Sequence, residues 1–406
     1  MKKKIVIYGG GTVERIDGHF ALCSPFKGAT AKKLGDMFRA RFGDTIDVEV
    51  RLTKYADPAS RIISNDDLKC DIEAVTADPT TKIVVMSAAV CNYSPAGDIE
   101  TEYGGAAAAS LGLKLAPKII HDIRQTRKDI FLVGFKSEEF ALRTQHMDNL
   151  YTSGLNLCKR ASCNLVFAND TGTRRHMIIT PEEARYGEHM TRDEALRELV
   201  DMTFHRSHLT FTRSTVVGHD PVGWDDKRIP LALKQVVQWC INAGAYKPFN
   251  GVTTGHFACK LDDQTFITSM RRTNFNRIME TGMVLIRTDG PDSVMAYGGK
   301  PSVGGQSQRI IFKDHPGFDC IVHFHCPKLS GSTVNTVSQR EFECGSHECG
   351  QNTSGGLTDV ADDIKAVFLD NHGPNIVFKS STDPARVIEH IEANYDLAAK
   401  TGGYVS

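Results

Sequence analysis

The stretch Cys320-Ile321-Val322-His323-Phe324-His325 predicts a buried strand, because β-branched and aromatic residues fill it. Side chains two residues apart project from the same face of a strand, so the two histidines would point the same way. A third histidine follows in Leu369-Asp370-Asn371-His372-Gly373. Three imidazoles bind zinc-like ions and leave a coordination position open, as catalytic sites require. The alternative is a set of hydrogen-bonded strand histidines without a metal.

Length and composition favour an ordinary two-domain globular protein. The chain has 406 residues, of which 41% are hydrophobic and 24% charged, with a formal net charge of −1. Nucleic-acid or membrane surfaces usually require a basic excess, which is absent here. We therefore expect small molecules and copies of the chain itself as partners, and no nucleic acid or membrane.

The N-terminus and the cysteines indicate a cytoplasmic protein. Four apolar residues follow the first lysines before glycine interrupts them, too few for a secretory signal. No run approaches the ~18 apolar residues of a membrane span. The 11 cysteines are scattered and should be reduced thiols. Cys344, His347 and Cys349 could hold zinc, but no second pair stands at finger-like spacing.

The first half alternates strands and helices. Apolar strand-like runs occupy residues 4–8, 46–52, 82–86, 130–135 and 165–168, with helical segments at 29–42 and 191–204. This alternation predicts a doubly wound, Rossmann-like parallel sheet over residues 1–210. Ligands bind beyond the carboxyl ends of such strands. Candidate binding residues follow the strands at residues 9–12, 87–95, 136–139 and 169–170.

The second half is a separate α/β domain. Residues 211–229 are polar and glycine-containing, and we expect them to form a linker. Residues 230–406 follow, with helices predicted at 231–243 and 384–399. Short strands at 266–268, 284–287, 321–325, 366–369 and 376–378, separated by turns, indicate a more antiparallel sheet. A low-complexity loop is expected at residues 104–109.

An ordered series of motifs over residues 3–205 resembles phosphopantothenoylcysteine synthetase. The series comprises Gly10–Asp17, Lys27–Thr30, Met86–Val90, Asn92-Tyr93, Leu115–Lys118, Gly134–Glu138 and Val166–Asp170. The resemblance implies a ligase of coenzyme A biosynthesis that activates 4'-phosphopantothenate with CTP or ATP, together with Mg²⁺, and captures the product with cysteine.

The same resemblance implies the binding residues. The glycine loop would meet the nucleotide phosphates, a second group would line the substrate cleft, and the remainder would contact the nucleotide. The residues are Gly10, Gly11 and Thr12; Ala88, Ala89 and Asn92; and Lys118, Lys136, Asn169 and Asp170. An ammonium at a strand end suits a polyphosphate, which makes Lys136 a catalytic candidate. A solvated surface lysine is the alternative.

Two departures argue against ordinary ligase activity. Residues 20–26 lack the asparagine that stabilises the acyl-nucleotide in the family, and residues 100–106 lack a lysine of its mobile loop. An acyl-nucleotide intermediate needs such donors. The nucleotide cleft would then persist with a changed reaction.

Residues 230–400 resemble the class II aldolase/adducin family. The matching pieces are Thr254–Ala258, Phe266–Ser269, Lys300–Ser302, Ile321–His325 and Leu369–Gly373. The resemblance implies an α/β/α domain in which His323, His325 and His372 bind zinc, and the metal would polarise a carbonyl. The implied substrate-phosphate residues are Thr254, Gly255, Thr268, Ser269 and Ser302.

This domain also departs from its family. The family's Pro-Ser-Ser-Glu supplies an acid-base glutamate, whereas this chain has Pro301-Ser302-Val303-Gly304, and a later histidine is Gln308. Retro-aldol cleavage lacks its usual proton-transfer group without that glutamate. Glu343 is the substitute we consider first, with Glu341 and Glu348 as others, although a solvated position would also explain each.

Three functions remain open from the sequence. The first is an enzyme that pairs a nucleotide- or phosphate-binding domain with a metal-dependent lyase or isomerase acting on a phosphorylated or nucleotide-linked carbonyl compound. The second is a phosphopantothenate-cysteine ligase with an aldolase-like appendage. The third is a noncatalytic binding or assembly protein. Because both families assemble as oligomers, we expect a homo-oligomer.

Overall fold

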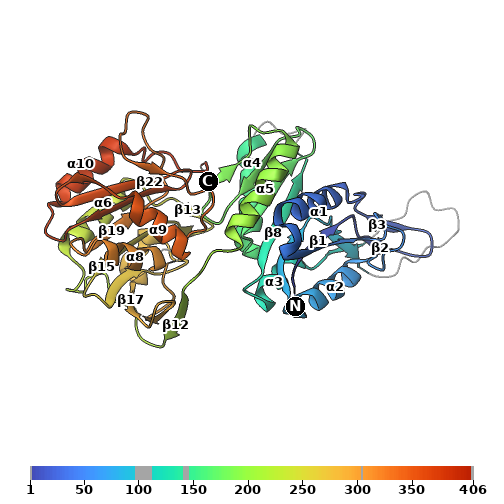
Figure 1. Ribbon diagram of the computed structural model, residues 1–406, viewed down its shortest axis with the longest axis horizontal. Helices are drawn as coiled ribbons and strands as arrows, with labels where there is room; N and C mark the ends of the chain where they lie inside the picture. The colour runs from blue at the N-terminus through green and yellow to red at the C-terminus, as the bar shows by residue number, and fades with distance from the viewer. Residues whose placement is uncertain (1, 97–111, 140–145, 303–304, 404–406) are drawn as a thin grey trace. The chain divides into compact units, whose positions relative to one another are not determined.

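The computed structural model describes residues 2–96, 112–139, 146–302 and 305–403, without the side chains of 146–148 and 305–306 (Figure 1). The chain divides into two compact units. The first comprises Met1–Pro181 and Tyr186–Ser207, and the second comprises Glu182–Arg185 and His208–Ser406. The loop expected at residues 104–109 lies outside the described residues.

The first unit contains a seven-stranded sheet in the order β11-β10-β9-β8-β5-β1-β4. Its strands are β1 (Lys3–Gly9), β4 (Ile46–Leu52), β5 (Thr81–Met86), β8 (Phe131–Glu138), β9 (Leu165–Asp170), β10 (His176–Ile179) and β11 (Arg185–Tyr186). The pairs from β4 to β9 are parallel, and β10 is antiparallel to β9. Two small antiparallel pairs combine β2 (Val13–Arg15) with β3 (Ala21–Cys23) and β6 (Tyr93–Pro95) with β7 (Leu113–Leu115).

Helices cover both faces of this sheet. They are α1 (Ala29–Phe42), α2 (Asn65–Ala77), α3 (Ile120–Thr126), α4 (His146–Ala161) and α5 (Arg192–Arg206). α1 packs with α5, whereas α3 packs with α2 and α4. Capping boxes at Ser64 and Thr191 satisfy the first backbone N–H groups of α2 and α5. The predicted doubly wound parallel domain is confirmed.

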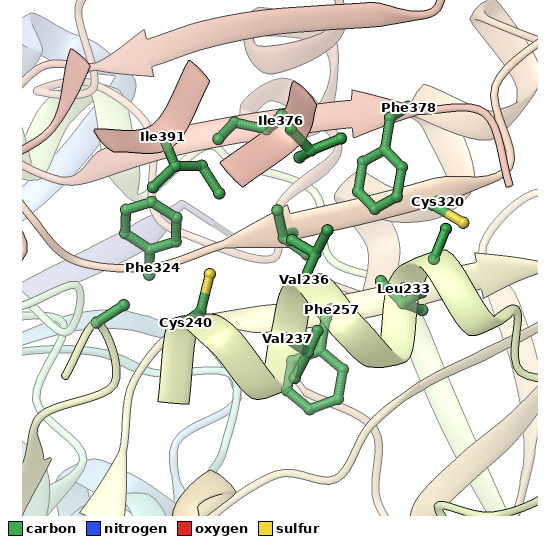
Figure 2. Packing of buried hydrophobic residues seen from close by; sticks show 14 of the residues in the cluster. Leu233, Val236, Val237, Cys240, Phe257, Cys320, Phe324, Ile376, Phe378 and Ile391 are labelled. Atoms are coloured by element: carbon green, nitrogen blue, oxygen red, sulfur yellow. The ribbon is translucent and has the colours of Figure 1, made fainter. Parts of the chain in front are cut away.

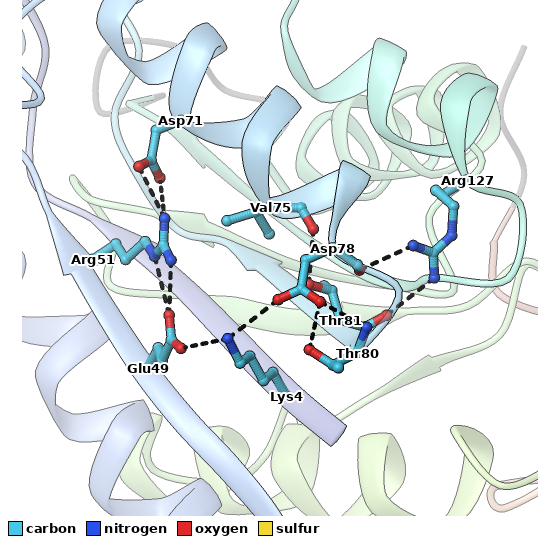
Figure 3. A network of polar contacts seen from close by, with 9 residues as sticks. All are labelled: Lys4, Glu49, Arg51, Asp71, Val75, Asp78, Thr80, Thr81 and Arg127. Atoms are coloured by element: carbon cyan, nitrogen blue, oxygen red, sulfur yellow. Dashed lines mark hydrogen bonds and ion pairs between the residues drawn. The ribbon is translucent and has the colours of Figure 1, made fainter. Parts of the chain in front are cut away.

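A polar network ties β1 and β4 to α2 (Figure 3). The Arg51 guanidinium pairs with Glu49 at 2.8 Å and Asp71 at 2.9 Å. Lys4 joins this group by contacting Glu49 at 3.3 Å and Asp78 at 3.2 Å. These charges are partly exposed, so they contribute more to the register of the elements than to stability.

The second unit is built on a ten-stranded sheet in the order β12-β18-β17-β16-β15-β19-β23-β22-β20, with β21 beside β22. The strands are β12 (Arg213–Val217), β15 (His256–Lys260), β16 (Thr265–Ser269), β17 (Met283–Thr288), β18 (Ser293–Tyr297), β19 (Cys320–His323), β20 (Thr336–Val337), β21 (Thr358–Ala361), β22 (Ile364–Leu369) and β23 (Gly373–Phe378). The central pairs from β18 to β22 are antiparallel, as predicted.

Helices on both faces give this unit the predicted α/β/α arrangement. They are α6 (Leu231–Asn242), α7 (Ile278–Thr281), α8 (Gly305–Asp314), α9 (His347–Gly356) and α10 (Pro384–Asn394). Residues of α6 and α10 pack on one face of the sheet, as Figure 2 shows, and residues of α8 pack on the other. Along β15 and β19 the side chains alternate between these two cores.

The prediction of a linker at 211–229 was wrong. Residues Arg213–Val217 form β12, which pairs in parallel with β18. Val222 bridges to Met283, and the Trp224 ring packs against Phe257. This segment is therefore part of the second unit. Its strand is mostly exposed and shows no apolar alternation that could reveal it.

Among the described residues, no helix is long and apolar enough to cross a membrane.

A substitution of Phe324 can test the packing beneath the two strand histidines. Its ring is fully buried and lies 5.8 Å from the Tyr395 ring. We expect Phe324→Ala to lower the free energy of unfolding by about 3–5 kcal/mol, because truncation leaves a cavity. Urea unfolding followed by tryptophan fluorescence reports this unit, since Trp224 and Trp239 both lie in it.

Leu231→Ala is the matched control, because Leu231 is 68% exposed. Its effect should stay within about 0.5 kcal/mol. Equal losses in the two variants would contradict the packing described for Phe324.

Candidate metal centre and anion-binding cavity

Three backbone segments bring the predicted metal histidines together. β19 ends at His323, His325 follows it, and His372 lies in the turn between β22 and β23. That turn lies close to the backbone that follows β19, because a Cβ on Gly373 would lie 2.1 Å from the Phe324 carbonyl oxygen. A side chain therefore cannot occupy position 373, which explains the glycine after His372.

The three imidazoles could hold a metal ion. One ligand atom from each of His323, His325 and His372 lies within 4.8 Å of the others, and all three residues are buried. Nε2 of His323 lies 3.3 Å from Nε2 of His372. His323 Nδ1 lies 2.7 Å from the Pro374 carbonyl oxygen, so this nitrogen is the N–H donor and Nε2 is free to bind a metal.

Burial keeps the imidazole of His323 neutral. Desolvation lowers its pKa to about 4 from an ordinary value of 6.5. Metal binding requires neutral imidazole, so this ring needs no deprotonation near pH 7. The donor set, its spacing and the neutral ring of His323 all fit a zinc-like ion.

A fourth histidine, His256, extends the cluster. It is the register partner of His323 across β15 and β19, and the two ring centroids are 4.8 Å apart. Nδ1 of His256 lies 2.6 Å from the amide of Gln308 on α8. Burial lowers the pKa of His256 well below its ordinary value. The sequence analysis included His256 only within a matching motif and Gln308 only as a departure from the family pattern, because strand register is invisible in the sequence.

Several predicted substrate-phosphate residues also come together beside this cluster. The Ser302 hydroxyl donates to the Gly255 carbonyl at 3.4 Å, and the Ser302 N–H donates to the Ser269 carbonyl at 3.0 Å. The Thr268 hydroxyl instead donates to the Phe257 carbonyl inside the sheet at 3.4 Å. Thr254 donates to Glu183 at 3.4 Å.

Two of the considered glutamates have structural contacts. Glu348 accepts the Thr210 N–H at 3.0 Å, and Glu341 pairs with Arg340 at 3.4 Å. The carbonyl of Glu343 accepts the Ser346 N–H at 3.1 Å, next to α9. A carboxylate that the sequence did not suggest is Glu183, which forms a buried ion pair with Lys400 at 2.5 Å in the second unit.

The first unit contains a half-open cavity of about 1410 Å³. Most of the predicted cofactor-binding residues line it, from strand ends and the loops that follow them. They are Ala88, Ala89, Asn92, Lys118, Lys136, Asn169 and Asp170. The structure thus brings together residues that the sequence places after three different strands, as expected at the carboxyl edge of a parallel sheet.

Positive charge dominates the cavity. Its cations are Lys118, Lys136, Arg160, Arg174, Arg175 and Arg192, and its acids are Glu138, Glu139 and Asp170. Desolvation and the neighbouring Lys136 lower the pKa of Lys118. Two ammonium groups this close favour an anionic ligand. Sequence reasoning missed the four arginines: Arg160 lies on α4 and Arg192 on α5, and Arg174 and Arg175 lie a few residues beyond the strand end at 169–170.

Polar contacts position two of these cations. Lys118 Nζ donates to the Asn92 side-chain oxygen at 2.6 Å, and Lys136 pairs with Glu138 at 3.0 Å. Burial lowers the pKa of Arg192, whose guanidinium lies 5.8 Å from the Phe167 ring centroid.

The glycine loop does not line the cavity. A Cβ on Gly10 would lie 2.3 Å from the Thr53 hydroxyl, and one on Gly11 would lie 1.5 Å from the Ser24 carbonyl. Thr12 is fully buried, and its hydroxyl donates to Asn65 at 2.7 Å. These residues hold neighbouring loops against β1, and Ser24 and Phe26 of the adjoining loop line the cavity.

Comparisons with known proteins agree with this division. Residues 1–202 match the DNA/pantothenate metabolism flavoprotein C-terminal domain, and residues 234–398 match the class II aldolase and adducin N-terminal domain. A search of curated proteins found no match.

Solved structures resemble each part separately. The DNA/pantothenate metabolism flavoprotein from Streptococcus pneumoniae is 21% identical, with a TM-score of 0.42 over 51% of this chain and 100% of that one. The C-terminal domain of the coenzyme A biosynthesis bifunctional protein CoaBC is 16% identical, with a TM-score of 0.36 over 49% and 92%. L-fuculose-1-phosphate aldolase from Thermus thermophilus is 15% identical, with a TM-score of 0.28 over 38% and 80%.

The two sheets and their sites define a two-domain α/β protein. Its first domain is similar to the DNA/pantothenate metabolism flavoprotein C-terminal domain, and its second to the class II aldolase and adducin N-terminal domain. The chain is a fusion of the two.

The buried imidazole of His323 predicts a pH dependence. Its pKa is lower in the folded state, so the unfolded chain binds the proton first and stability is lost as pH falls from about 6.5 to about 4. In the presence of EDTA, the titration of His323 should lower the free energy of unfolding by about 1.4 kcal/mol for each unit that the pH falls within this interval. Urea melts at stepped pH measure this slope.

His323→Gln is the test variant, because glutamine does not titrate. Its stability should vary less with pH than that of the wild type across this interval. Identical slopes in the two proteins would contradict the assignment.

Proposed function

We propose that the second domain contains a divalent-metal site, with zinc as its ion. This domain would act as a lyase or isomerase on a phosphorylated or nucleotide-linked carbonyl compound. The observation that carries the proposal is the buried cluster of His323, His325 and His372. Three protein nitrogens leave a position for water or substrate, as in catalytic rather than structural zinc sites.

The chain's own residues would bind and orient the substrate. A bound divalent ion would polarise a carbonyl and stabilise the negative charge that develops on its oxygen. Gly255, Ser269 and Ser302 lie together beside the histidines and offer hydroxyl and backbone groups to a phosphate. His256, positioned by Gln308, adds a neutral imidazole next to His323.

We further propose that the first domain binds a nucleotide, CTP or ATP, or another phosphorylated small molecule. The cavity has twice as many cationic side chains as acidic ones, and its cations include four arginines, which suit phosphate geometry. Lys136 would contact the phosphates. Together with the metal centre, this makes an enzyme with two ligand sites.

Metal uptake tests the first part of the proposal. Protein stripped with EDTA should gain stability with Zn²⁺ or Co²⁺, by about 2.7 kcal/mol when the free metal is 100 times its Kd. His323→Ala and His372→Ala should abolish this gain, measured by thermal unfolding and elemental analysis.

His219→Ala is the control, because His219 is exposed and lies outside the cluster. It should keep the full gain. A wild-type protein that folds and takes up no divalent ion would contradict the metal assignment.

Nucleotide binding tests the second part. CTP or ATP with Mg²⁺ should raise the thermal midpoint of the wild type. Lys136→Ala and Arg192→Ala should each weaken binding about tenfold or more, because each removes a charge-assisted hydrogen bond. Lys128→Ala, at an exposed lysine outside the cavity, should bind as the wild type does.

Equal affinity in all three variants would mean that the cavity is not the binding site. Calorimetric titration of each variant with each nucleotide gives these affinities.

A phosphopantothenate-cysteine ligase is the second candidate function. The observation that favours it is the Lys118–Asn92 contact within the cavity, because both residues belong to the motifs shared with that family. Pyrophosphate release from CTP or ATP, dependent on phosphopantothenate and cysteine, would support ligase activity. Its absence in a protein that binds nucleotide would refute it.

A further inference from the structure

A C-terminal segment, residues 395–401, runs beside the backbone that carries His325. The Asp396 N–H donates to the Pro327 carbonyl at 2.9 Å, and the Thr401 N–H donates to the His325 carbonyl at 3.0 Å. One histidine of the metal centre is therefore hydrogen-bonded through its backbone to this C-terminal segment.

A buried ion pair fixes the segment. Lys400 Nζ contacts the Glu183 carboxylate at 2.5 Å, and the two side chains are 3% and 1% exposed. The Thr254 hydroxyl donates to the same carboxylate at 3.4 Å. Thr254 precedes Gly255, where a Cβ would lie 2.5 Å from the His323 carbonyl oxygen. The Glu183 carboxylate thus joins the C-terminal segment to the loop that packs against the backbone of His323.

Glu183 itself is held in a strained position. Its backbone has φ 70°, a left-handed conformation that is uncommon outside glycine. Such strain persists only where surrounding contacts impose it, and it clusters at functional sites. The neighbouring Glu182 carboxylate accepts the Cys344 N–H at 2.6 Å, which anchors Glu182–Arg185 within the second unit. The contacts of this segment therefore outweigh a conformational cost in order to bring Glu183 to Lys400.

The pair combines two parts of the chain that the comparisons with known families separate. Glu183 lies within residues 1–202, which match the first family, although it belongs to the second unit. Lys400 lies just beyond residue 398, where the match to the second family ends. The second unit is therefore completed by an ion pair that neither matching region contains.

We propose that the Glu183–Lys400 ion pair is a positioning device for the metal centre, which holds residues 395–401 against His325 and so fixes the direction of this ligand. The inference rests on the proposed metal site. Removing one partner of a buried pair leaves an uncompensated charge, which the protein can hydrate only by moving its segment towards water. The hydrogen bond from Thr401 to His325 is then lost. Metal ligands must be held within about 0.5 Å of their working positions, so a small shift weakens binding.

Cobalt titration of the full chain tests this role. Protein stripped with EDTA is titrated with Co²⁺, whose visible absorption reports the geometry of its ligands. Glu183→Gln and Lys400→Met should each bind Co²⁺ about tenfold more weakly than the wild type, with a changed spectrum at saturation, because a contact behind a ligand is lost. Lys400→Arg keeps the charge and should bind Co²⁺ more tightly than Lys400→Met. Wild-type affinity and spectrum in Glu183→Gln and Lys400→Met would overturn the proposal.

The double variant Glu183→Gln/Lys400→Met leaves no unpaired charge, so it serves if a single variant does not fold. It should also bind Co²⁺ about tenfold more weakly than the wild type, because the contact that holds the segment is gone. Wild-type affinity in this variant would likewise count against the positioning role.

Ile286→Ala is the matched control for lost stability. Ile286 is 1% exposed and lies on β17, in the core that α8 covers. This variant should lower the thermal midpoint and keep the wild-type Co²⁺ affinity and spectrum. A change as large as that in Glu183→Gln would mean that general destabilisation disturbs the site, and the pair would have no positioning role.

Trypsin cleavage separates this inference from the metal proposal, because it requires no metal. In metal-free Glu183→Gln, cleavage after Lys400 should be at least about tenfold faster than in the wild type, where Lys400 is buried. Equal cleavage rates would overturn the proposal even if Co²⁺ binds. A wild type that binds no Co²⁺, with faster cleavage in the variant, would instead contradict the metal assignment on which the inference rests.

Discussion

The second domain depends on a close approach of three backbone segments that leaves no room for side chains at the contacts. A Cβ on Gly255 would lie 2.5 Å from the His323 carbonyl, and one on Gly373 would lie 2.1 Å from the Phe324 carbonyl. Both glycines have positive φ, so other residues would be strained there even with space available. This approach brings His256 beside His323 and brings His372 beside both strand histidines.

Burial then determines the chemistry of the cluster. The buried imidazoles of His323 and His256 stay neutral, because a charged ring would lose its hydration. Neutral rings with converging nitrogens are ligands for a metal. The first domain differs, because its cations lie around a half-open cavity at the carboxyl edge of a parallel sheet.

Local patterns predicted much of the fold. The bounds of α1 and β4 agree with the sequence expectation to the residue, because an apolar stripe and an alternating β-branched run define them. β12 escaped prediction because it is short, mostly exposed and without apolar alternation, and only its pairing with β18 makes it a strand. The same limit applies to the site. The His-x-His pair is visible in the sequence, whereas His256 joins it through strand register and Arg192 joins the cavity through packing between α5 and the sheet.

Zinc K-edge X-ray absorption on the loaded full chain tests the central claim most directly, because it identifies the atoms bound to the metal. The account predicts three imidazole nitrogens at about 2.0–2.1 Å with a further light atom, and loss of this signal in His323→Ala. A shell of sulfur at about 2.3 Å would place the ion at cysteines such as Cys344 and Cys349, and would contradict the assignment of the histidine cluster as the metal centre.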